Sequence, residues 1–154
     1  MIDSVLDYLI EHKITVATAE SCTAGMIAAR IGDKSGVSEV FSEGFVTYSN
    51  RAKEKNLGVA CELLEKYGAV SEEVARAMAE GVCRVTGARL GLSATGIAGP
   101  TGGTDTKPVG LVYMGVCLDG ECSVVKRIFN GTRAQVRAKT VETVFAEVKK
   151  RLQI

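Results

Sequence analysis

Short β-branched runs alternate with amphipathic segments through the first hundred residues, and a hairpin signal follows them. Residues 14–18 are typical of a buried strand, whereas residues 71–85 repeat their apolar side chains at helical spacing. Asp119 and Gly120 stand between two apolar runs, which predicts a tight turn between antiparallel strands. Alternation favours parallel strands joined by crossover helices, and the hairpin adds antiparallel ones. We therefore expect a single α/β domain over residues 1–154, a three-layer α/β/α sandwich with a mixed central sheet.

Periodicity, together with cap and turn residues, predicts the boundaries of the individual elements. The expected helices cover residues 2–12, 24–31, 51–57, 60–66, 71–85 and 132–152. The expected strands cover residues 14–18, 40–48, 90–94, 109–118 and 122–129. Asp3 or Ser4 is expected to cap the first helix, and Ser49 with Asn50 the third. Residues 95–108 form the longest stretch without expected structure, and loops of that length are usually functional.

Composition excludes several classes of partner. The 154 residues are 46% hydrophobic, enough for one closed core, and the formal net charge of +1 supplies no field for nucleic acid or an acidic membrane. No apolar run approaches the length of a membrane span, and the acidic first segment is typical of a helix rather than an export signal. The five cysteines are odd in number and form no CxxC pair, which favours reduced thiols. We expect a soluble cytoplasmic protein.

The first segment that could carry chemistry is the turn at residues 18–25, between a strand and a helix. Ser21 could be a nucleophile there, with the N–H groups of the next residues forming part of an oxyanion hole. The alternative is that Ser21 or Thr23 only caps the helix. Cys22 competes with Ser21, because a thiol at a helix start can have a lowered pKa. The segment lacks the GxSxG pattern of a nucleophile elbow, so the motif itself does not decide.

A nucleophilic serine needs a base, and the chain restricts the choice. Its single histidine, His12, follows the first helix, apart from the polar clusters, so a Ser-His-Asp triad is not expected. Tyr48 ends an expected strand, and Lys53 lies one turn inside the next helix, so both could point into one cleft. A desolvated Lys53 could then accept the proton of Ser21. The alternative is a solvated lysine and a tyrosine at the rim.

The third segment is the glycine-rich stretch at residues 93–103, which follows an expected strand. Its glycines let backbone N–H groups approach an anion closely, although it matches neither the Walker A pattern nor GxGxxG. Arg133 follows Gly131 at the start of the last helix, where it could assist a phosphate or only take part in a cap. No spacing of histidines, cysteines or acids suggests a zinc or magnesium site, so no metal is expected.

Four segments occur in a characteristic order along the chain: AESCTAG, GFVTYSNRAKEKNLGV, GAVSEEVARAMAEGV, and SATGIAGPTGG followed by KPVGLVY. Together they resemble the CinA C-terminal domain family, over about residues 14–131. Stand-alone members are known as PncC-type nicotinamide-nucleotide amidohydrolases. They hydrolyse the carboxamide of nicotinamide mononucleotide to nicotinate mononucleotide and ammonia for NAD recycling, without a metal or organic cofactor. Longer members carry an additional N-terminal domain with nucleotide pyrophosphatase activity, which the resemblance does not transfer to these residues.

The resemblance implies a role for particular residues. It makes Ser21 the nucleophile, with Tyr48 and Lys53 as the other catalytic residues, and implies a homodimer or a higher homo-oligomer. A non-catalytic pyridine-nucleotide-binding module is the alternative function. The resemblance also implies that residues of the turn, of the segment GFVTYSNRAKEKNLGV, of the glycine-rich loop and of the last helix bind the substrate. They are Glu20, Cys22, Thr23, Asn50, Thr95, Gly96, Ile97, Ala98, Gly99, Gly102, Gly103 and Arg133.

Overall fold

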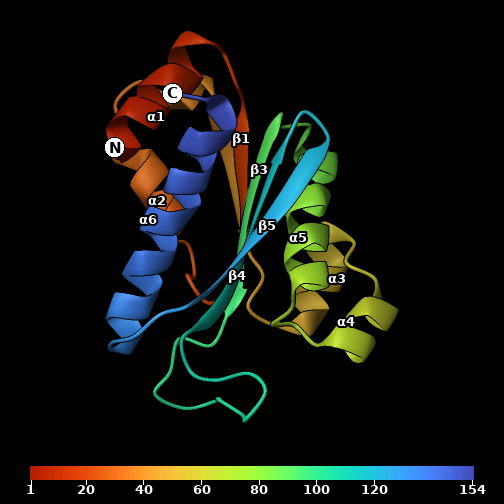
Figure 1. Cartoon of the computed structure of the whole chain (residues 1–154). Coiled ribbons are helices and arrows are strands. Elements are labelled where there is room, and N and C mark those ends of the chain that lie inside the picture. Colours follow the sequence, from red (N-terminus) through yellow and green to blue (C-terminus); the bar gives the residue numbers. More distant parts are fainter.

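A computed structural model describes residues 1–154 as a five-stranded sheet between two layers of helices (Figure 1). The strands are β1 (Val16–Glu20), β2 (Phe41–Val46), β3 (Leu90–Gly96), β4 (Leu111–Leu118) and β5 (Glu121–Ile128). The helices are α1 (Ile2–Glu11), α2 (Met26–Gly32), α3 (Asn50–Leu57), α4 (Cys61–Tyr67), α5 (Glu72–Thr86) and α6 (Arg133–Leu152), with a 3-10 turn at Val37–Glu39. The strand order is β2-β1-β3-β4-β5, with β2, β1 and β3 parallel and the β3–β4 and β4–β5 pairs antiparallel. The expected three-layer sandwich with a mixed sheet is confirmed.

The two helical layers bury separate hydrophobic clusters against the sheet. Helices α1, α2 and α6 cover one face, and α3, α4 and α5 cover the other (Figure 1). Val136, Val144 and Val148 of α6 are buried in the larger cluster, at the spacing that the sequence predicts for an inward helical face. Val74 and Met78 of α5 are buried in the smaller cluster on the opposite face. The interior strand β1 lies between the two clusters, and all five of its residues are buried.

Side-chain caps fix three of the six helix starts, those of α3, α5 and α6. Ser49 accepts a hydrogen bond from Ala52 N at the start of α3, and Ser71 does the same for Val74 N at the start of α5. The expected cap of the first helix is wrong. Met1 occupies the N-cap position without a side-chain bond, and the hydroxyl of Ser4 instead donates back to Met1 O.

The first strand and the helix after it begin later than the sequence predicts. Strand β1 continues through Glu20, whose fully buried carboxylate accepts hydrogen bonds from Ile27 N and Ala28 N of α2. Ala24 and Gly25 have φ angles of 47° and 95°, a conformation that cannot continue a right-handed helix, so α2 begins only at Met26. Glu20 therefore acts as the end of a strand and as a cap for α2, instead of as part of a polar turn.

The cysteines differ from the expectation of reduced thiols alone. Cys117 and Cys122 form a disulfide across the β4–β5 hairpin, while Cys22, Cys61 and Cys83 are free. The strand register places the two bonded residues directly opposite each other, with Cα atoms 4.0 Å apart. Such a short separation is typical of antiparallel pairs that exchange no backbone hydrogen bonds. The pairing therefore follows from the hairpin register, which a search for CxxC motifs does not detect.

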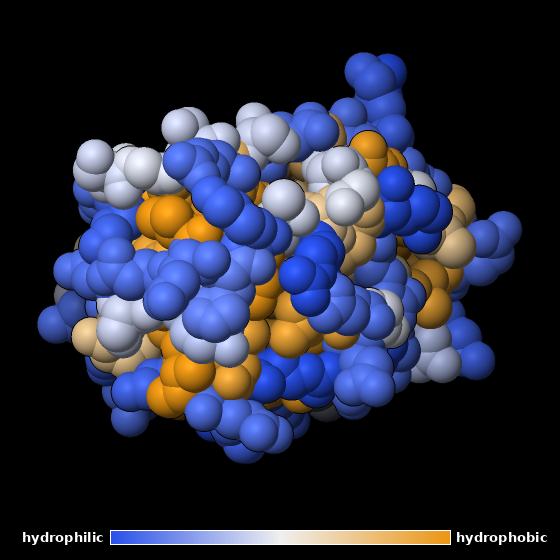
Figure 2. Space-filling model, turned by 90° about the horizontal axis from the view of Figure 1, so that it is seen from above, coloured by the Kyte–Doolittle hydropathy of each residue, from blue (hydrophilic) through white to orange (hydrophobic).

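The topology directs two chain segments to one edge of the sheet. Strand β1 leads into α2 on one face, whereas its neighbour β2 leads into α3 on the other face. Ligands of open α/β sheets bind at such switch points, beyond the carboxyl ends of the strands. The long loop after β3 extends from this end of the molecule, at the bottom of Figure 1. The opposite end presents mainly hydrophilic side chains around small apolar patches (Figure 2).

None of the six helices combines the length and the apolar character that crossing a membrane would require.

Candidate active site

Ser21 stands immediately beyond the end of β1, where the sheet holds it. Its backbone N–H donates to Ala94 O of β3 at 2.9 Å, and its side chain is buried. On the other side of β1, Thr47 N donates to Glu20 O at 2.8 Å, which brings the segment after β2 alongside the serine. Lys53 Nζ lies 3.1 Å from Ser21 Oγ. The structure therefore brings together the candidate nucleophile and one of the two candidate bases that the sequence suggests.

Lys53 is fully buried, an unusual position for a lysine. It lies on the inner face of α3 together with Leu57, one helical turn later, which is also fully buried. Its Nζ bonds to Thr47 O at 2.7 Å and to Ser21 Oγ, and no carboxylate pairs with it. Burial lowers the pKa of Lys53 from 10.5 to about 8. A substantial fraction of the amine is therefore neutral near pH 8 and able to accept a proton from the serine.

Cys22 has the opposite electrostatic setting. Its side chain packs in the larger hydrophobic cluster, and burial raises the pKa of its thiol to about 11. Nucleophilic attack requires the thiolate, which is scarce at neutral pH when the pKa is that high. The environment therefore favours Ser21 over Cys22 as the nucleophile.

The turn after Ser21 carries backbone donors without acceptors. The N–H groups of Cys22 and Thr23 form no hydrogen bond within the chain, whereas that of Ala24 donates to Ser21 O at 3.0 Å. Free N–H groups beside a nucleophile are the usual components of an oxyanion hole.

Arg137 of α6 bonds to this turn from the helical layer opposite Lys53, a contact that was not predicted from the sequence. Its Nε donates to Cys22 O and its Nη2 to Thr23 O, each at 3.0 Å. The only signal in the sequence is its position one helical turn after Arg133.

A cavity of about 270 Å³ opens in front of Ser21. Its wall comes from the ends of β1 and β3, the segment after β2, helix α3, the segment before α5, the loop after β3 and the start of α6. The lining residues are Ser21, Cys22, Tyr48, Lys53, Ala69, Val70, Thr95, Gly96, Ile97, Ala98, Gly99, Thr101, Gly102 and Arg133. Ala69 and Val70 come from a segment that carries no predicted site residue, whereas Thr101 lies in the predicted glycine-rich stretch.

Four residues that the resemblance assigns to substrate binding lie outside this lining. Glu20 points to α2, and Thr23 is fully buried with a hydroxyl that has no hydrogen-bond partner. Asn50 is exposed in the first turn of α3, and Gly103 packs against Val109. Glu20, Thr23 and Gly103 each follow or precede a lining residue in the chain, whereas Asn50 does not.

The glycine-rich loop presents a row of free backbone donors. Its base is closed by hydrogen bonds from Ile97 N to Leu111 O and from Gly110 N to Ile97 O. Between these bonds, the N–H groups of Ala98, Gly99, Thr101 and Gly102 have no acceptor in the chain. Such a row of unpaired N–H groups can surround an anion.

Arg133 joins the loop to the opposite wall at the mouth of the cavity. Its Nη1 donates to Gly99 O at 3.0 Å, and its Nη2 donates to Tyr48 Oη at 2.8 Å. Tyr48 is 58% exposed, and its hydroxyl bonds to neither Ser21 nor Lys53. The geometry therefore favours Lys53 as the base and places Tyr48 at the rim.

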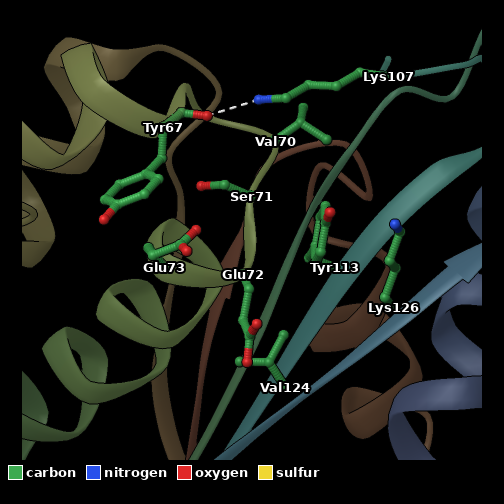
Figure 3. A pocket seen from close by; sticks show the side chains of 9 residues that line it. All are labelled: Tyr67, Val70, Ser71, Glu72, Glu73, Lys107, Tyr113, Val124 and Lys126. Atoms are coloured by element: carbon green, nitrogen blue, oxygen red, sulfur yellow. Dashed lines mark hydrogen bonds between the residues drawn. The ribbon is translucent and has the colours of Figure 1, made fainter.

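A larger cavity, of about 420 Å³, adjoins the first and shares Val70 with it. Figure 3 shows its nine lining residues, which are Tyr67, Val70, Ser71, Glu72, Glu73, Lys107, Tyr113, Val124 and Lys126. Lys107 reaches across it from the loop after β3 and donates to Tyr67 O at 2.6 Å. The only hydroxyl that resembles a nucleophile there, that of Ser71, donates to Gly68 O and caps α5. This cavity is larger than the one in front of Ser21, but the candidate nucleophile Ser21 and the candidate base Lys53 line the smaller one.

Known proteins match nearly the whole chain in sequence. A model of the CinA C-terminal domain matches residues 1–152. A competence-damage inducible protein of Clostridium perfringens is 54% identical over 145 residues, which are 94% of this chain and 35% of that protein. Another, of Clostridioides difficile, is 47% identical over 151 residues, which are 98% of this chain and 36% of that protein. The chain thus spans about a third of the length of these curated relatives.

Solved structures match over nearly the whole chain. A CinA superfamily protein from Klebsiella pneumoniae superimposes with a TM-score of 0.95 and 32% identity, covering 99% of this chain and 95% of that chain. The competence/damage inducible protein CihA from Agrobacterium tumefaciens gives 0.89 and 38%, covering 96% and 93%.

Proposed function

The chain belongs to the CinA C-terminal domain family, and from that premise we propose that it hydrolyses the linear carboxamide of nicotinamide mononucleotide. The products are nicotinate mononucleotide and ammonia. The observation that carries the proposal is the contact of 3.1 Å between Ser21 Oγ and the buried Nζ of Lys53. Burial without a carboxylate partner favours the neutral amine, the form in which a lysine can act as a general base.

In the first half of the reaction, neutral Lys53 accepts the proton of Ser21 while Oγ attacks the carboxamide carbon. Negative charge develops on the carboxamide oxygen, where the free N–H groups of Cys22 and Thr23 can donate to it. The carbon–nitrogen bond then breaks, and the lysine ammonium returns its proton to the departing nitrogen. Ammonia leaves, and an ester joins Ser21 to the nicotinate group.

In the second half, water occupies the place that ammonia has left. Lys53 accepts a proton from the water, the hydroxide attacks the ester carbon, and the same N–H groups stabilise the charge. The bond to Ser21 breaks, Oγ recovers its proton, and nicotinate mononucleotide departs. One amide and one water are consumed, and one carboxylate and one ammonium ion are formed, because the ammonia takes up the proton that the product acid releases near neutral pH.

The nucleotide's phosphate requires a local site, because the net charge of +1 supplies no general attraction for anions. The glycine-rich loop supplies it in this proposal, through the free N–H groups of Ala98, Gly99 and Gly102. Arg133 adds a positive charge at the mouth of the same cavity. Loss of the phosphate should therefore weaken binding.

The test is an ammonia-release assay of the purified protein with nicotinamide mononucleotide, nicotinamide riboside and NAD. We expect turnover of the mononucleotide, its loss in Ser21→Ala, and its retention in Cys22→Ala. Full activity of Ser21→Ala combined with loss in Cys22→Ala would move the nucleophile to Cys22. Equal turnover of all three compounds would contradict the role of the loop as a phosphate site.

A non-catalytic pyridine-nucleotide-binding module is the second candidate. It is favoured by the relatives, which are named for competence and damage induction and have about two thirds of their own length outside the match. This function predicts that nicotinamide mononucleotide raises the melting temperature without ammonia release. Stabilisation that persists in Ser21→Ala, in a protein that shows no turnover, would favour it over the hydrolase.

A further inference from the structure

Arg137 contacts the nucleophile turn from the layer opposite Lys53. Its half-buried guanidinium makes two hydrogen bonds of 3.0 Å, to the carbonyl oxygens of Cys22 and Thr23, 115 and 114 residues away along the chain. It does not line the cavity, and no carboxylate pairs with it. We propose that Arg137 is a positioning residue, which orients the turn's free N–H groups as an oxyanion hole. The inference rests on the proposed hydrolysis and extends it to a residue that does not touch the substrate.

The bond from Arg137 to Cys22 O also sets the direction in which the N–H of Thr23 points. In a trans peptide the C=O and N–H groups point to opposite sides. The carbonyl of Cys22 points to Arg137 in the α6 layer, so the N–H of Thr23, which belongs to the same peptide unit, points away from that layer. This N–H has no acceptor in the chain. Fixing the carbonyl therefore fixes the direction of a free donor beside Ser21.

The second contact prevents the turn from rotating. A single hydrogen bond would allow the Cys22–Thr23 peptide to swing about its neighbours, but a guanidinium bonded to two successive carbonyls is a rigid fork. From the other layer, Lys53 bonds to Ser21 Oγ. The turn is thus held from both sides, and the donors need not reorganise when charge develops.

The charge of Arg137 also acts at this turn. Burial dominates and raises the pKa of Cys22, while the positive charge of Arg137 acts in the opposite direction and favours negative charge there. No acid neutralises the guanidinium, so the same field favours the oxyanion of the reaction. Arg133, one helical turn earlier, has a different task, because it lies at the mouth of the cavity.

The test compares steady-state kinetics of full-length variants with nicotinamide mononucleotide. Arg137→Met should lower kcat roughly tenfold to hundredfold, since the loss of one oxyanion donor costs about that much or more, and should change KM by less than about threefold. Arg137→Lys keeps the charge but cannot bridge both carbonyls, so an intermediate kcat is expected. In Arg137→Ala, added methylguanidinium should restore activity and methylammonium should not. The matched control is Arg76→Met, which removes a guanidinium bond of 2.8 Å to Cys122 O away from the cavity.

The outcomes separate the inference from the proposed function. Absence of ammonia release by the wild-type protein would overturn both. An active wild type with an unchanged kcat in Arg137→Met would overturn the inference alone. An equal loss in Arg76→Met, or a loss in Arg137→Met that appears only as a higher KM, would also overturn it. Should the methionine variant not fold, a folded Arg137→Lys with wild-type kcat decides against the positioning role.

Discussion

Replacing Lys53 by methionine should stabilise the protein near pH 7 while abolishing its activity. The lysine has a pKa of 10.5 in an exposed setting and of about 8 in the fold, because burial disfavours the ammonium. At about 1.4 kcal/mol for each pKa unit, keeping it protonated costs the fold roughly 3 kcal/mol. Methionine fills similar space without a charge, but it leaves Thr47 O without its donor, at a cost of about 1–2 kcal/mol. The expected net gain is about 1–2 kcal/mol.

The difference in the free energy of unfolding between the two proteins should depend on pH. The folded pKa lies below the unfolded one, so the unfolded chain binds more protons between about pH 8 and pH 10.5. The cost of burying the ammonium is complete below that window and disappears above it, and wild-type stability therefore rises across it. The methionine variant lacks this dependence. Its advantage in the free energy of unfolding should shrink by roughly 2 kcal/mol between about pH 7 and about pH 9.5.

The measurement is urea unfolding, followed by circular dichroism, of both proteins near these two pH values. Lys55→Met is the matched control, because Lys55 lies on the same helix with its side chain exposed. It should change stability little, and by the same amount at both pH values. A Lys53→Met protein that is less stable than wild type near pH 7, or a difference that does not change with pH, would refute the reasoning. Lys53 would then bear no desolvation cost, and the argument for a neutral amine would fail.

Three further predictions concern the base, the strand end and the loop. The value of kcat/KM should rise with pH to a plateau with its midpoint near 8, the pKa of Lys53, and a flat profile from about pH 6 to pH 9 would contradict this base. Glu20→Gln replaces one of two acceptor oxygens that bond to α2, so we expect a loss of roughly 1–3 kcal/mol in urea unfolding, and an unchanged midpoint would contradict the capping role. Lys107→Met removes the bond to Tyr67 O, and amide exchange in residues 98–107 should accelerate while KM rises a few-fold. Lys126→Met in the same cavity is its control, and equal effects of both substitutions would show that the bond does not hold the loop.

Local signals predicted most of the fold. The inward face of α5, the cap at Ser49 and the turn at Asp119 and Gly120 depend on residues a few positions apart, and the structure places each where the sequence indicates. The mixed sheet follows from the order of these elements. The disulfide between Cys117 and Cys122 was missed, although the register of a two-residue hairpin turn makes those positions opposite neighbours. Hairpin register was therefore a usable signal that a count of cysteines does not include.

Contacts between distant segments could not be predicted in the same way. Glu20 looked like a turn residue because its partners at Ile27 and Ala28 are backbone groups, which leave no mark on side-chain type. The bonds of Arg137 to two carbonyls were invisible for the same reason, across more than 100 residues. In both cases a charged side chain bonds to backbone groups. Every residue has such groups, so the residue type of the partner does not indicate the contact.

Lys53 shows how a sequence signal can be read once the packing is known. It lies four residues before Leu57, so the two share a face of α3, and an exposed lysine there would require Leu57 to be exposed as well. The fold buries both. A buried lysine needs either an acid beside it or a lowered pKa, and no carboxylate bonds to Lys53. The second condition must therefore hold, and the free energy that it costs the fold is the same quantity that makes the amine available to Ser21 near neutral pH.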